Sequence, residues 1–561
     1  MSDSAMSATR VDRVVQALVV AGFILVLGLG ALLPVYSDEI GWRLQERAWI
    51  DGVDKAYSDL CGPASLAAPP WFMMPVRWFS ASANQMLANP LFVRMEGVAC
   101  AIAWVALVWV LIARLTTDRT RRLSVRTLVF ALLGMGTLPY LLVMSRPEQP
   151  LLLALTLMLL IALSRPGGAA VTAVKAAGIV LLAGVAMSYH LKGVAYAPVA
   201  LACLAVCANG RATIAPRLVA AGALLAAMAA SASYWISRFQ CPGDALMATK
   251  MGEENLASAL SAGVAWPAVL LQAVKGVSPM NYVLLAVPSN TPMSAWVPEK
   301  LFPDLVPPIF TVALWLPWAA AILMAAIMLT RFVWRERMGA LREPRVLLAL
   351  AIMACVMVWG ASQVNRNVYE AGHVLPMLAL FVALCLTLPA AWPGWLTRPV
   401  GWLIAVAAVV ALSSQVVLVR FTAQPLLAAT QIPGALPKQE FSVSLAGYGT
   451  VRTDIAKAMA LAGIAADSRQ PGLMIDDVTY LALQRHPLPF HRLGVTEAWN
   501  IGIDNPAAYL VSRNSAGVVA SCRHLPMEME LAAVTSGEIC ALSPAMLKEL
   551  AAPPPSLWGD E

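Results

Sequence analysis

The chain has 561 residues, of which 59% are hydrophobic and 13% charged, and its mean hydropathy is +0.70. Average soluble domains carry about a quarter charged residues, so this composition excludes an ordinary soluble protein and indicates a polytopic α-helical membrane protein. The formal net charge of +7 comes from basic residues in short loops between apolar runs. That pattern follows the positive-inside rule and argues against a nucleic-acid partner.

About eleven apolar runs follow one another along the chain, each near or a little below the roughly 20 residues that a transmembrane helix needs. No separate n-region, h-region and cleavage site precedes the first run, so we interpret it as a retained span. The predicted spans are 13–35, 90–114, 126–144, 150–164, 171–189, 193–208, 217–236, 308–330, 345–361, 371–389 and 399–419.

Basic loops set the predicted orientation. The loops at 114–122, 211–217 and 331–345 fall on one side if the odd-numbered spans run outward, and that side is the cytoplasm. The N-terminus is then cytoplasmic in a multi-pass protein. The long loops at 37–88 and 237–307 fall on the outer face, where their amphipathic, Trp-bearing stretches are expected to lie on the membrane surface.

The chain after the last span differs in kind, which divides it into a membrane bundle at 1–430 and a second domain at 431–561. The second region mixes helical periodicity at 453–464 with strand-like runs at 472–475 and 507–511. At about 130 residues it can bury a core of its own. We therefore predict a small external α/β domain.

Four cysteines fall on the predicted outer face, and the other five fall within spans, where they fit small core residues. An oxidising compartment permits disulfides. The 17 residues between Cys522 and Cys540 form a loop that can close, so we predict a Cys522–Cys540 bridge. Cys61–Cys241 is a second candidate, and four free thiols is the alternative.

Four polar clusters fall at the outer ends of predicted spans. Each alone is more often an interfacial turn than a site, because surface loops are generally polar. Together they supply carboxylates that can act as a general base for a hydroxyl, and Lys and Arg that can hold an anionic phosphate. Charge at membrane depth is costly unless it faces a cavity or a partner. The clusters are Asp38-Glu39, Arg146-Pro147-Glu148-Gln149-Pro150, Tyr189-His190-Leu191-Lys192-Gly193, and Asn365-Arg366-Asn367 with Tyr369, Glu370 and His373.

These motifs, in this order, resemble the polytopic glycosyltransferases that use polyprenyl-phosphate sugars, known as the GT-C fold. Within that group, the motifs resemble those of the protein O-mannosyltransferases and the lipid A aminoarabinose transferases. The matching features are the acidic pair after the first span, an arginine followed closely by an acid, a Lys-Gly opening the sixth span, and the stretch from Tyr369 to Leu380. The resemblance covers about residues 10–390 in architecture.

The resemblance implies a membrane enzyme that moves a sugar from a polyprenyl-phosphate donor to a lipid, glycan or protein acceptor. The reaction would take place at the outer face of the bacterial cytoplasmic (inner) membrane. Asp38 is the hypothesised general base, which deprotonates the acceptor hydroxyl for a direct displacement with inversion. Glu39 and Glu148 would orient hydroxyls or hold a divalent cation. The residues expected at the donor phosphate are Lys192, Arg366, His190, His373 and Arg146.

Several alternatives stay open at this point. The two histidines His190 and His373 equally fit hydrogen-bonded interfacial residues, and Arg146 equally fits a partner for a neighbouring carboxylate. The carboxylates suit Mg or Mn, but Lys and Arg can supply the positive charge, so no obligatory metal is expected. A transporter or flippase of an anionic lipid-linked substrate would also explain charged turns, although transporter sites lie near the midplane. A non-enzymatic scaffold is the third reading.

Overall fold

A computed structural model of the protein describes most of the helical bundle and much of the C-terminal region. The described residues are 2–32, 35–36, 39, 90–146, 148–189, 191–207, 214–239, 306–361, 371–390, 392–431, 442–443, 448–465, 473–476, 479, 483, 490–492, 505–512 and 515–552. Of the two predicted outer-face loops, 37–88 and 237–307, the structure describes Glu39, the last turn of a helix ending at Phe239, and residues 306–307 at the start of the next helix.

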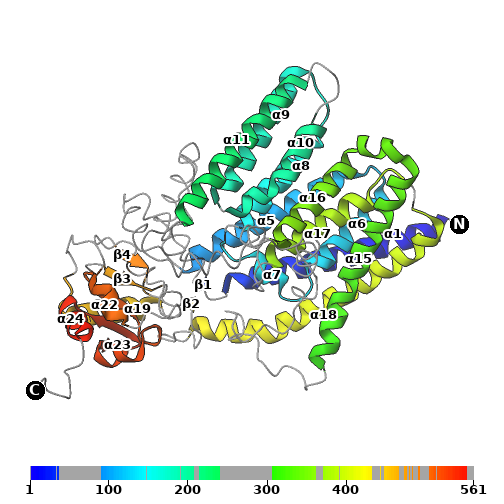
Figure 1. The fold of residues 1–561 in the computed structure, drawn as a ribbon. Coiled ribbons are helices and arrows are strands. Elements are labelled where there is room, and N and C mark those ends of the chain that lie inside the picture. Colours follow the sequence, from blue (N-terminus) through cyan, green and yellow to red (C-terminus); the bar gives the residue numbers. More distant parts are fainter. Residues whose placement is uncertain are drawn as a thin grey trace, which may run out of the picture.

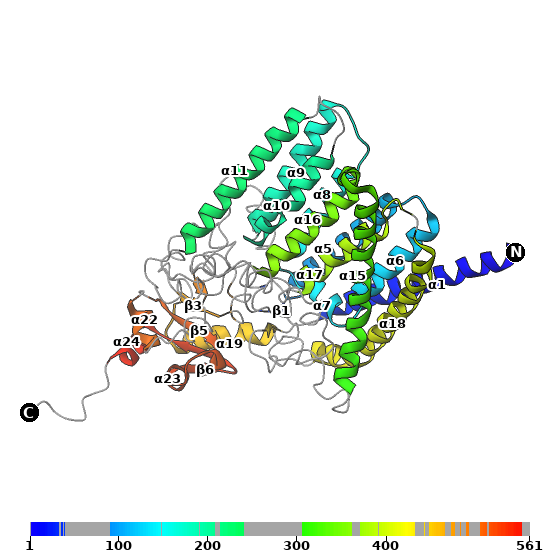
Figure 2. The same cartoon turned by 45° about the vertical axis from the view of Figure 1, so that its right-hand side comes forward.

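Apolar helices pack side by side in one bundle, and a small sheet lies beyond one end of it (Figures 1 and 2). The bundle elements are α1 (Ser2–Leu29), η1 (Gly30–Leu32), α5 (Pro90–Leu115), α6 (Arg119–Leu133), α7 (Leu138–Leu142), α8 (Glu148–Ala162), α9 (Ala169–Tyr189), η4 (Leu191–Tyr196), α10 (Ala197–Val206), α11 (Ile214–Phe239), α15 (Val306–Glu336), η7 (Arg337–Arg342), α16 (Pro344–Ala361), α17 (Ala371–Leu386) and α18 (Gly394–Gln431).

Within the described residues, five helices are long and apolar enough to cross a membrane, judged by length and composition. They are Val11–Leu29, Arg94–Leu115, Ala169–Met187, Val312–Arg342 and Gly394–Arg420. Five further apolar helices of 10–17 residues accompany them. The protein is therefore a helical membrane protein, and the count of eleven spans stays a prediction.

The predicted third span, 126–144, is not one continuous helix. Helix α6 ends at Leu133 and α7 begins only at Leu138. Gly136 between them has a φ of 59°, a conformation that glycine adopts without steric cost. Its N–H donates to Ser414 Oγ on α18 at 2.8 Å, which holds the break against a neighbouring helix.

Buried polar contacts join helices within an otherwise apolar core. Trp104 Nε1 of α5 donates to Thr156 Oγ1 of α8 at 3.0 Å, and Gln415 Nε2 of α18 donates to Val19 O of α1 at 3.4 Å. A hydrogen bond is stronger in the low-dielectric core than in water, so each of these bonds sets the register of one helix on the next.

The C-terminal region forms a five-stranded sheet of order β4-β3-β5-β7-β6. Strands β3, β4 and β5 are parallel, whereas β7 is antiparallel to β5 and β6. Helices α22 and α24 share a core with one face, and α19 packs against β5, β6 and β7. The elements are α19 (Tyr448–Leu461), β3 (Leu473–Ile475), β4 (Phe490–Arg492), α22 (Pro506–Ser512), β5 (Gly517–Ser521), η9 (Cys522–His524), α23 (Met527–Ala532), β6 (Val534–Ser536), β7 (Ile539–Leu542) and α24 (Pro544–Ala551).

Three sequence predictions for this region can be compared with the sheet. The helix at 453–464 and the strand at 472–475 are confirmed as α19 and β3. The strand at 507–511 is wrong, because these residues form α22. Asn505 Oδ1 accepts a hydrogen bond from Ala508 N at 2.9 Å, and Pro506 opens the helix, so an N-cap outweighs the β-propensity of this run.

The predicted disulfide is present. Cys522 and Cys540 are bridged, with their Cα atoms 4.9 Å apart. The bridge ties the turn after β5 to strand β7. The second predicted pair, Cys61–Cys241, lies outside the described residues.

A separate two-stranded ribbon links distant parts of the chain. Strand β1 (Val35–Tyr36) follows η1, and strand β2 (Ser442–Val443) lies between α18 and α19. They pair antiparallel, Val35 facing Val443 and Tyr36 facing Ser442.

Candidate functional site

Glu39 is the described member of the predicted acidic pair, and it is fully buried in an ion pair. Its Oε2 lies 2.9 Å from Arg94 NH2, and the side-chain exposures of Arg94 and Glu39 are 2% and 0%. Its Oε1 accepts a hydrogen bond from Ser145 N at 2.6 Å. One carboxylate therefore joins three segments: the stretch after α1, the start of α5 and the turn after α7.

The same turn lies directly against α5. Ser145 Oγ donates to Glu96 Oε2 at 3.1 Å. A Cβ added to Gly97 would lie 2.0 Å from the carbonyl oxygen of Val143, so only glycine permits the observed approach of helix to turn. This close backbone contact holds the residues that follow Val143 at a fixed distance from Glu39.

Arg146 and Glu148 form the next pair along the turn. Arg146 Nε lies 3.1 Å from Glu148 Oε2, and both side chains are nearly buried. Arg146 NH2 donates to Glu148 Oε1 at 3.4 Å. The amide of Gln149 closes the turn, because Oε1 accepts from Arg146 N at 2.8 Å while Nε2 donates to Leu142 O at 3.2 Å. The alternative that Arg146 pairs with a neighbouring carboxylate is confirmed.

His373 is buried in an aromatic stack near this turn. Its ring lies parallel to Tyr196 of η4 at 5.6 Å and tilted against Trp359 of α16 at 4.5 Å. The hydroxyl of Tyr196 is 3.4 Å from both ring nitrogens. The carboxylate of Glu148 is close enough to Tyr196 to interact with its hydroxyl electrostatically.

The start of α17 touches α7, because a Cβ at Gly372 would lie 3.3 Å from the Leu141 side chain and carbonyl oxygen. Four of the eight predicted site residues are thus described with their side chains: Glu39, Arg146, Glu148 and His373. Glu39 is bonded to the turn that carries Arg146 and Glu148, and the residue before His373 lies against Leu141 of the helix that leads into this turn. Of Lys192 only the backbone is described, in η4. Asp38, His190 and Arg366 lie outside the described residues, so their roles stay predictions.

Arg94 and Glu96 were not predicted as site residues. The available signal was a charge at the start of an apolar run, which is rare unless the group has a partner or a function. No group of three or more His, Cys, Asp or Glu side chains suited to a metal ion occurs within the described part of the chain. Metal dependence stays a prediction.

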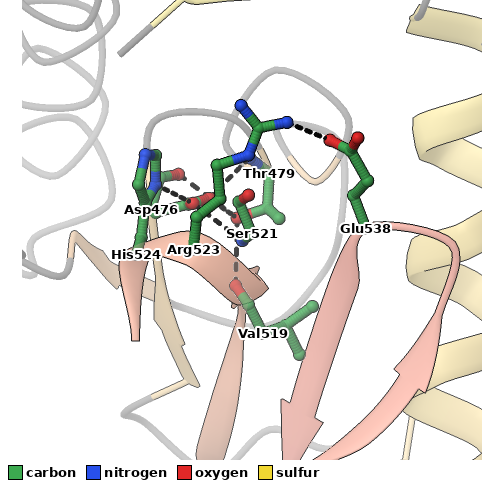
Figure 3. A network of polar contacts seen from close by, with 7 residues as sticks. All are labelled: Asp476, Thr479, Val519, Ser521, Arg523, His524 and Glu538. Carbon is green, nitrogen blue, oxygen red and sulfur yellow. Dashed lines mark hydrogen bonds and ion pairs between the residues drawn. The ribbon is translucent and has the colours of Figure 1, made fainter. Parts of the chain in front are cut away.

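A second buried polar cluster lies in the C-terminal sheet, where β3 and β5 end side by side (Figure 3). Asp476 Oδ2 accepts from Ser521 N at 2.8 Å and contacts His524 Nδ1 at 2.6 Å. Asp476 Oδ1 accepts from Thr479 N at 2.9 Å and from Thr479 Oγ1 at 2.8 Å. Thr479 Oγ1 also lies 3.0 Å from Val519 O.

These bonds keep Asp476 ionised. Burial alone would raise the pKa of Asp476, but the hydrogen bond and charge of His524, with the N–H groups of Ser521 and Thr479, lower it below its ordinary value of 3.8. An ionised carboxylate only accepts hydrogen bonds, so Nδ1 of His524 carries the proton.

Arg523 lies beside this pair, and its guanidinium contacts Glu538 in an ion pair that is partly exposed (Figure 3). Three consecutive residues of η9 therefore each bind another strand or its end: Cys522 and Arg523 bind the β6–β7 hairpin, and His524 binds Asp476 after β3. These contacts hold together the ends of β3 and β5 and the β6–β7 hairpin. This is a structural cluster with no demonstrated chemistry.

No protein-family model and no curated protein matches the sequence. Among solved structures, the chain is similar to ArnT from Cupriavidus metallidurans in the apo state, with a TM-score of 0.44, 12% identity and coverage of 98% of this chain and 100% of that one. The undecaprenyl phosphate-bound form of that ArnT has a TM-score of 0.40, 14% identity and the same coverage.

The archaeal oligosaccharyltransferase AglB from Archaeoglobus fulgidus, in complex with an inhibitory peptide and a dolichol-phosphate, has a TM-score of 0.38 and 13% identity. That match covers 90% of this chain and 69% of AglB. Every one of these TM-scores is below 0.5, so the matches carry no conclusion about the function of this chain.

Proposed function

We propose that the protein is an integral-membrane glycosyltransferase that moves a sugar from a polyprenyl-phosphate donor to an acceptor at the outer face of the cytoplasmic membrane. The observation that supports this most is the buried Glu39–Arg94 pair, bonded to the turn that carries Arg146 and Glu148. Buried ionisable groups at the end of an apolar bundle are costly, and function is the usual reason for them.

The contacts of Glu39 suggest different roles for the two acids of the pair, Asp38 and Glu39. Both carboxylate oxygens of Glu39 take part in bonds, which suits an orienting role. We therefore assign the general base to Asp38. It would take the proton of the acceptor hydroxyl as that oxygen attacks the anomeric carbon. The bond from the anomeric carbon to the phosphate oxygen would break in the same step, with inversion, and polyprenyl phosphate would leave.

The departing phosphate needs positive charge. Arg146 is already offset by Glu148, and Arg94 by Glu39. In the proposal, Lys192 and Arg366 supply the charge, since ammonium and guanidinium groups bind phosphate oxygens well. His373, stacked between Tyr196 and Trp359, would support this end of the bundle rather than contact the phosphate.

Purified protein in lipid nanodiscs, incubated with a panel of radiolabelled polyprenyl-phosphate sugars and a bacterial membrane extract as the acceptor source, tests the proposal. The expected result is release of free polyprenyl phosphate and transfer of the label to a new product. In sealed vesicles, a transporter or flippase would instead move the donor across the membrane intact. Donors that all stay uncleaved would contradict glycosyl transfer.

A further inference from the structure

The β1–β2 ribbon joins the candidate site to the approach of the C-terminal sheet. Strand β1 (Val35–Tyr36) ends two residues before Asp38 in the sequence. Strand β2 (Ser442–Val443) lies between the end of α18 and the start of α19, on the only covalent connection from the bundle to the C-terminal region. The ribbon therefore brings together two segments that are about 400 residues apart, by the antiparallel pairing that the register defines.

Helix packing explains why these two strands meet. Helix α1 leads into β1 and α18 leads toward β2, and the two helices lie side by side (Figure 2). Gln415 of α18 donates to Val19 O of α1, and a Cβ at Gly22 would lie 2.0 Å from Gln415 Oε1. This close contact between α1 and α18 brings the segments that follow the two helices near each other, where β1 and β2 pair.

In the sequence, Asp38 is thus flanked by two points whose positions are held by contacts. On one side, the backbone of Val35 and Tyr36 is paired with β2. On the other side, Glu39 is bonded to Arg94 and to Ser145 N. Asp38 lies between these points in the sequence.

We infer that β2 is a positioning element for the candidate site: its backbone holds β1, which ends two residues before the proposed base in the sequence, and so fixes one end of the short segment of chain that leads to Glu39. This inference rests on the proposed glycosyl transfer. A two-stranded ribbon of this length is marginal by itself, so its geometry depends on what holds each strand. Strand β2 lies between α18 and the C-terminal region in the chain. A displacement of the C-terminal region would therefore move Ser442 and Val443, and with them the paired strand β1.

Paired cysteines test the geometry without any activity assay. In a Cys61→Ser/Cys241→Ser background, the facing pairs Val35→Cys/Val443→Cys and Tyr36→Cys/Ser442→Cys place Cα atoms at distances that a disulfide spans, about 4.4–6.8 Å. The offset control Val35→Cys/Ser442→Cys points its side chains to opposite faces. We expect at least one facing pair to cross-link in the full-length protein and the offset pair not to. Equal cross-linking of offset and facing pairs, or none in either facing pair, would overturn the ribbon.

Proline and alanine variants test the catalytic consequence. Facing pairs alternate between hydrogen-bonded and non-hydrogen-bonded pairs, so either Ser442→Pro or Val443→Pro removes a ladder donor. The proline variant that loses a ladder hydrogen bond should lower kcat by about 10- to 100-fold with the donor KM unchanged. The reason is that a misplacement of a catalytic group by about 1 Å can lower the rate ~10²-fold. The alanine variants at the same positions keep the N–H groups and should stay within about 2-fold of wild type.

The outcomes separate the two claims. Unchanged kcat in both proline variants, with an active wild type, would overturn the positioning role and leave the proposed function intact. A wild type that cleaves no donor would remove the proposed function and the catalytic role of β2 together, while the cross-linking result would still report the ribbon. Deuterium exchange of peptides from β5 checks that the C-terminal sheet is folded in each variant, and the mass of the protein checks that the Cys522–Cys540 bridge has formed.

Discussion

Glu39 and Arg94 stabilise the protein only as a pair. Each is a full charge withdrawn from water, and the cost of that transfer is offset by the other charge and by the Ser145 N–H. Removing one partner leaves the other buried without its counter-charge. Removing both avoids that penalty, so the two losses are not additive.

We predict that Arg94→Gln and Glu39→Gln each lower the free energy of unfolding by about 3–5 kcal/mol, and that the double variant loses less than the sum. Arg335→Gln is the control, because Arg335 and Glu336 form an exposed pair of the kind worth about 0–1 kcal/mol. Thermal unfolding in detergent or nanodiscs measures the series. Additive losses in the double variant would show that the two side chains are not coupled.

Asp476 makes a pH-dependent contribution in the C-terminal sheet. Its pKa in the folded protein is lowered, so its contribution to stability is complete well above 3.8 and is lost as the pH falls below that value. Asp476→Asn removes this titration. We predict that the difference in denaturant midpoint between wild type and Asp476→Asn is largest near neutral pH and shrinks toward about pH 2.

Deuterium exchange of peptides from β5 reports the unfolding of this sheet in the full-length chain. The other carboxylates titrate in both proteins, so the difference between the two isolates Asp476. A difference that stays constant across this pH range would mean that folding does not shift the pKa of Asp476, which would contradict the effect expected from the four hydrogen bonds that its carboxylate accepts.

At the scale of elements, contacts at helix ends set the site, and Gly97 is the clearest of them. A Cβ at this position would lie 2.0 Å from a backbone oxygen of the α7–α8 turn, so the helix or the turn must move. Gly222 in α11 has nothing within 4 Å of the same added atom. The two glycines therefore form a matched pair in helices of equal length.

We predict that Gly97→Ala lowers the free energy of unfolding by about 1–3 kcal/mol through overpacking. Gly222→Ala should raise it by about 0.5–1 kcal/mol, since alanine favours the helix over glycine. Gly97→Ala should also reduce sugar transfer, because it displaces the turn that holds Glu39 and Arg146, whereas Gly222→Ala should not. Equal stability and equal transfer in the two variants would contradict the close contact between α5 and the turn.

Element boundaries also show where sequence reasoning succeeded. Apolar runs such as 90–114 and 171–189 appear as α5 and α9 because hydropathy over about 20 residues is a strong signal. The run at 126–144 is apolar throughout, but Gly134, Gly136 and Pro139 carry the backbone information that hydropathy ignores. Asn505-Pro506 likewise marked a helix start that the strand-like run obscured.

At the scale of the whole molecule, residues far apart in sequence could be predicted to meet only where a simple rule connected them. The Cys522–Cys540 bridge followed from loop closure and compartment, and it is confirmed. Asp476 and His524 carried no such signal, because their contact depends on β3 and β5 pairing as parallel neighbours. The β1–β2 ribbon depends in the same way on the packing of α1 against α18.

In the proposed reaction, Asp38 removes a proton from the acceptor during transfer of a sugar from a polyprenyl-phosphate donor. The most direct measurement compares donor cleavage by wild type and Asp38→Asn, which keeps the side-chain shape and removes proton acceptance. Turnover should fall by about 10²–10⁴-fold while donor affinity changes little, since this is the usual size of general-base catalysis. Near-wild-type turnover in Asp38→Asn would contradict the account.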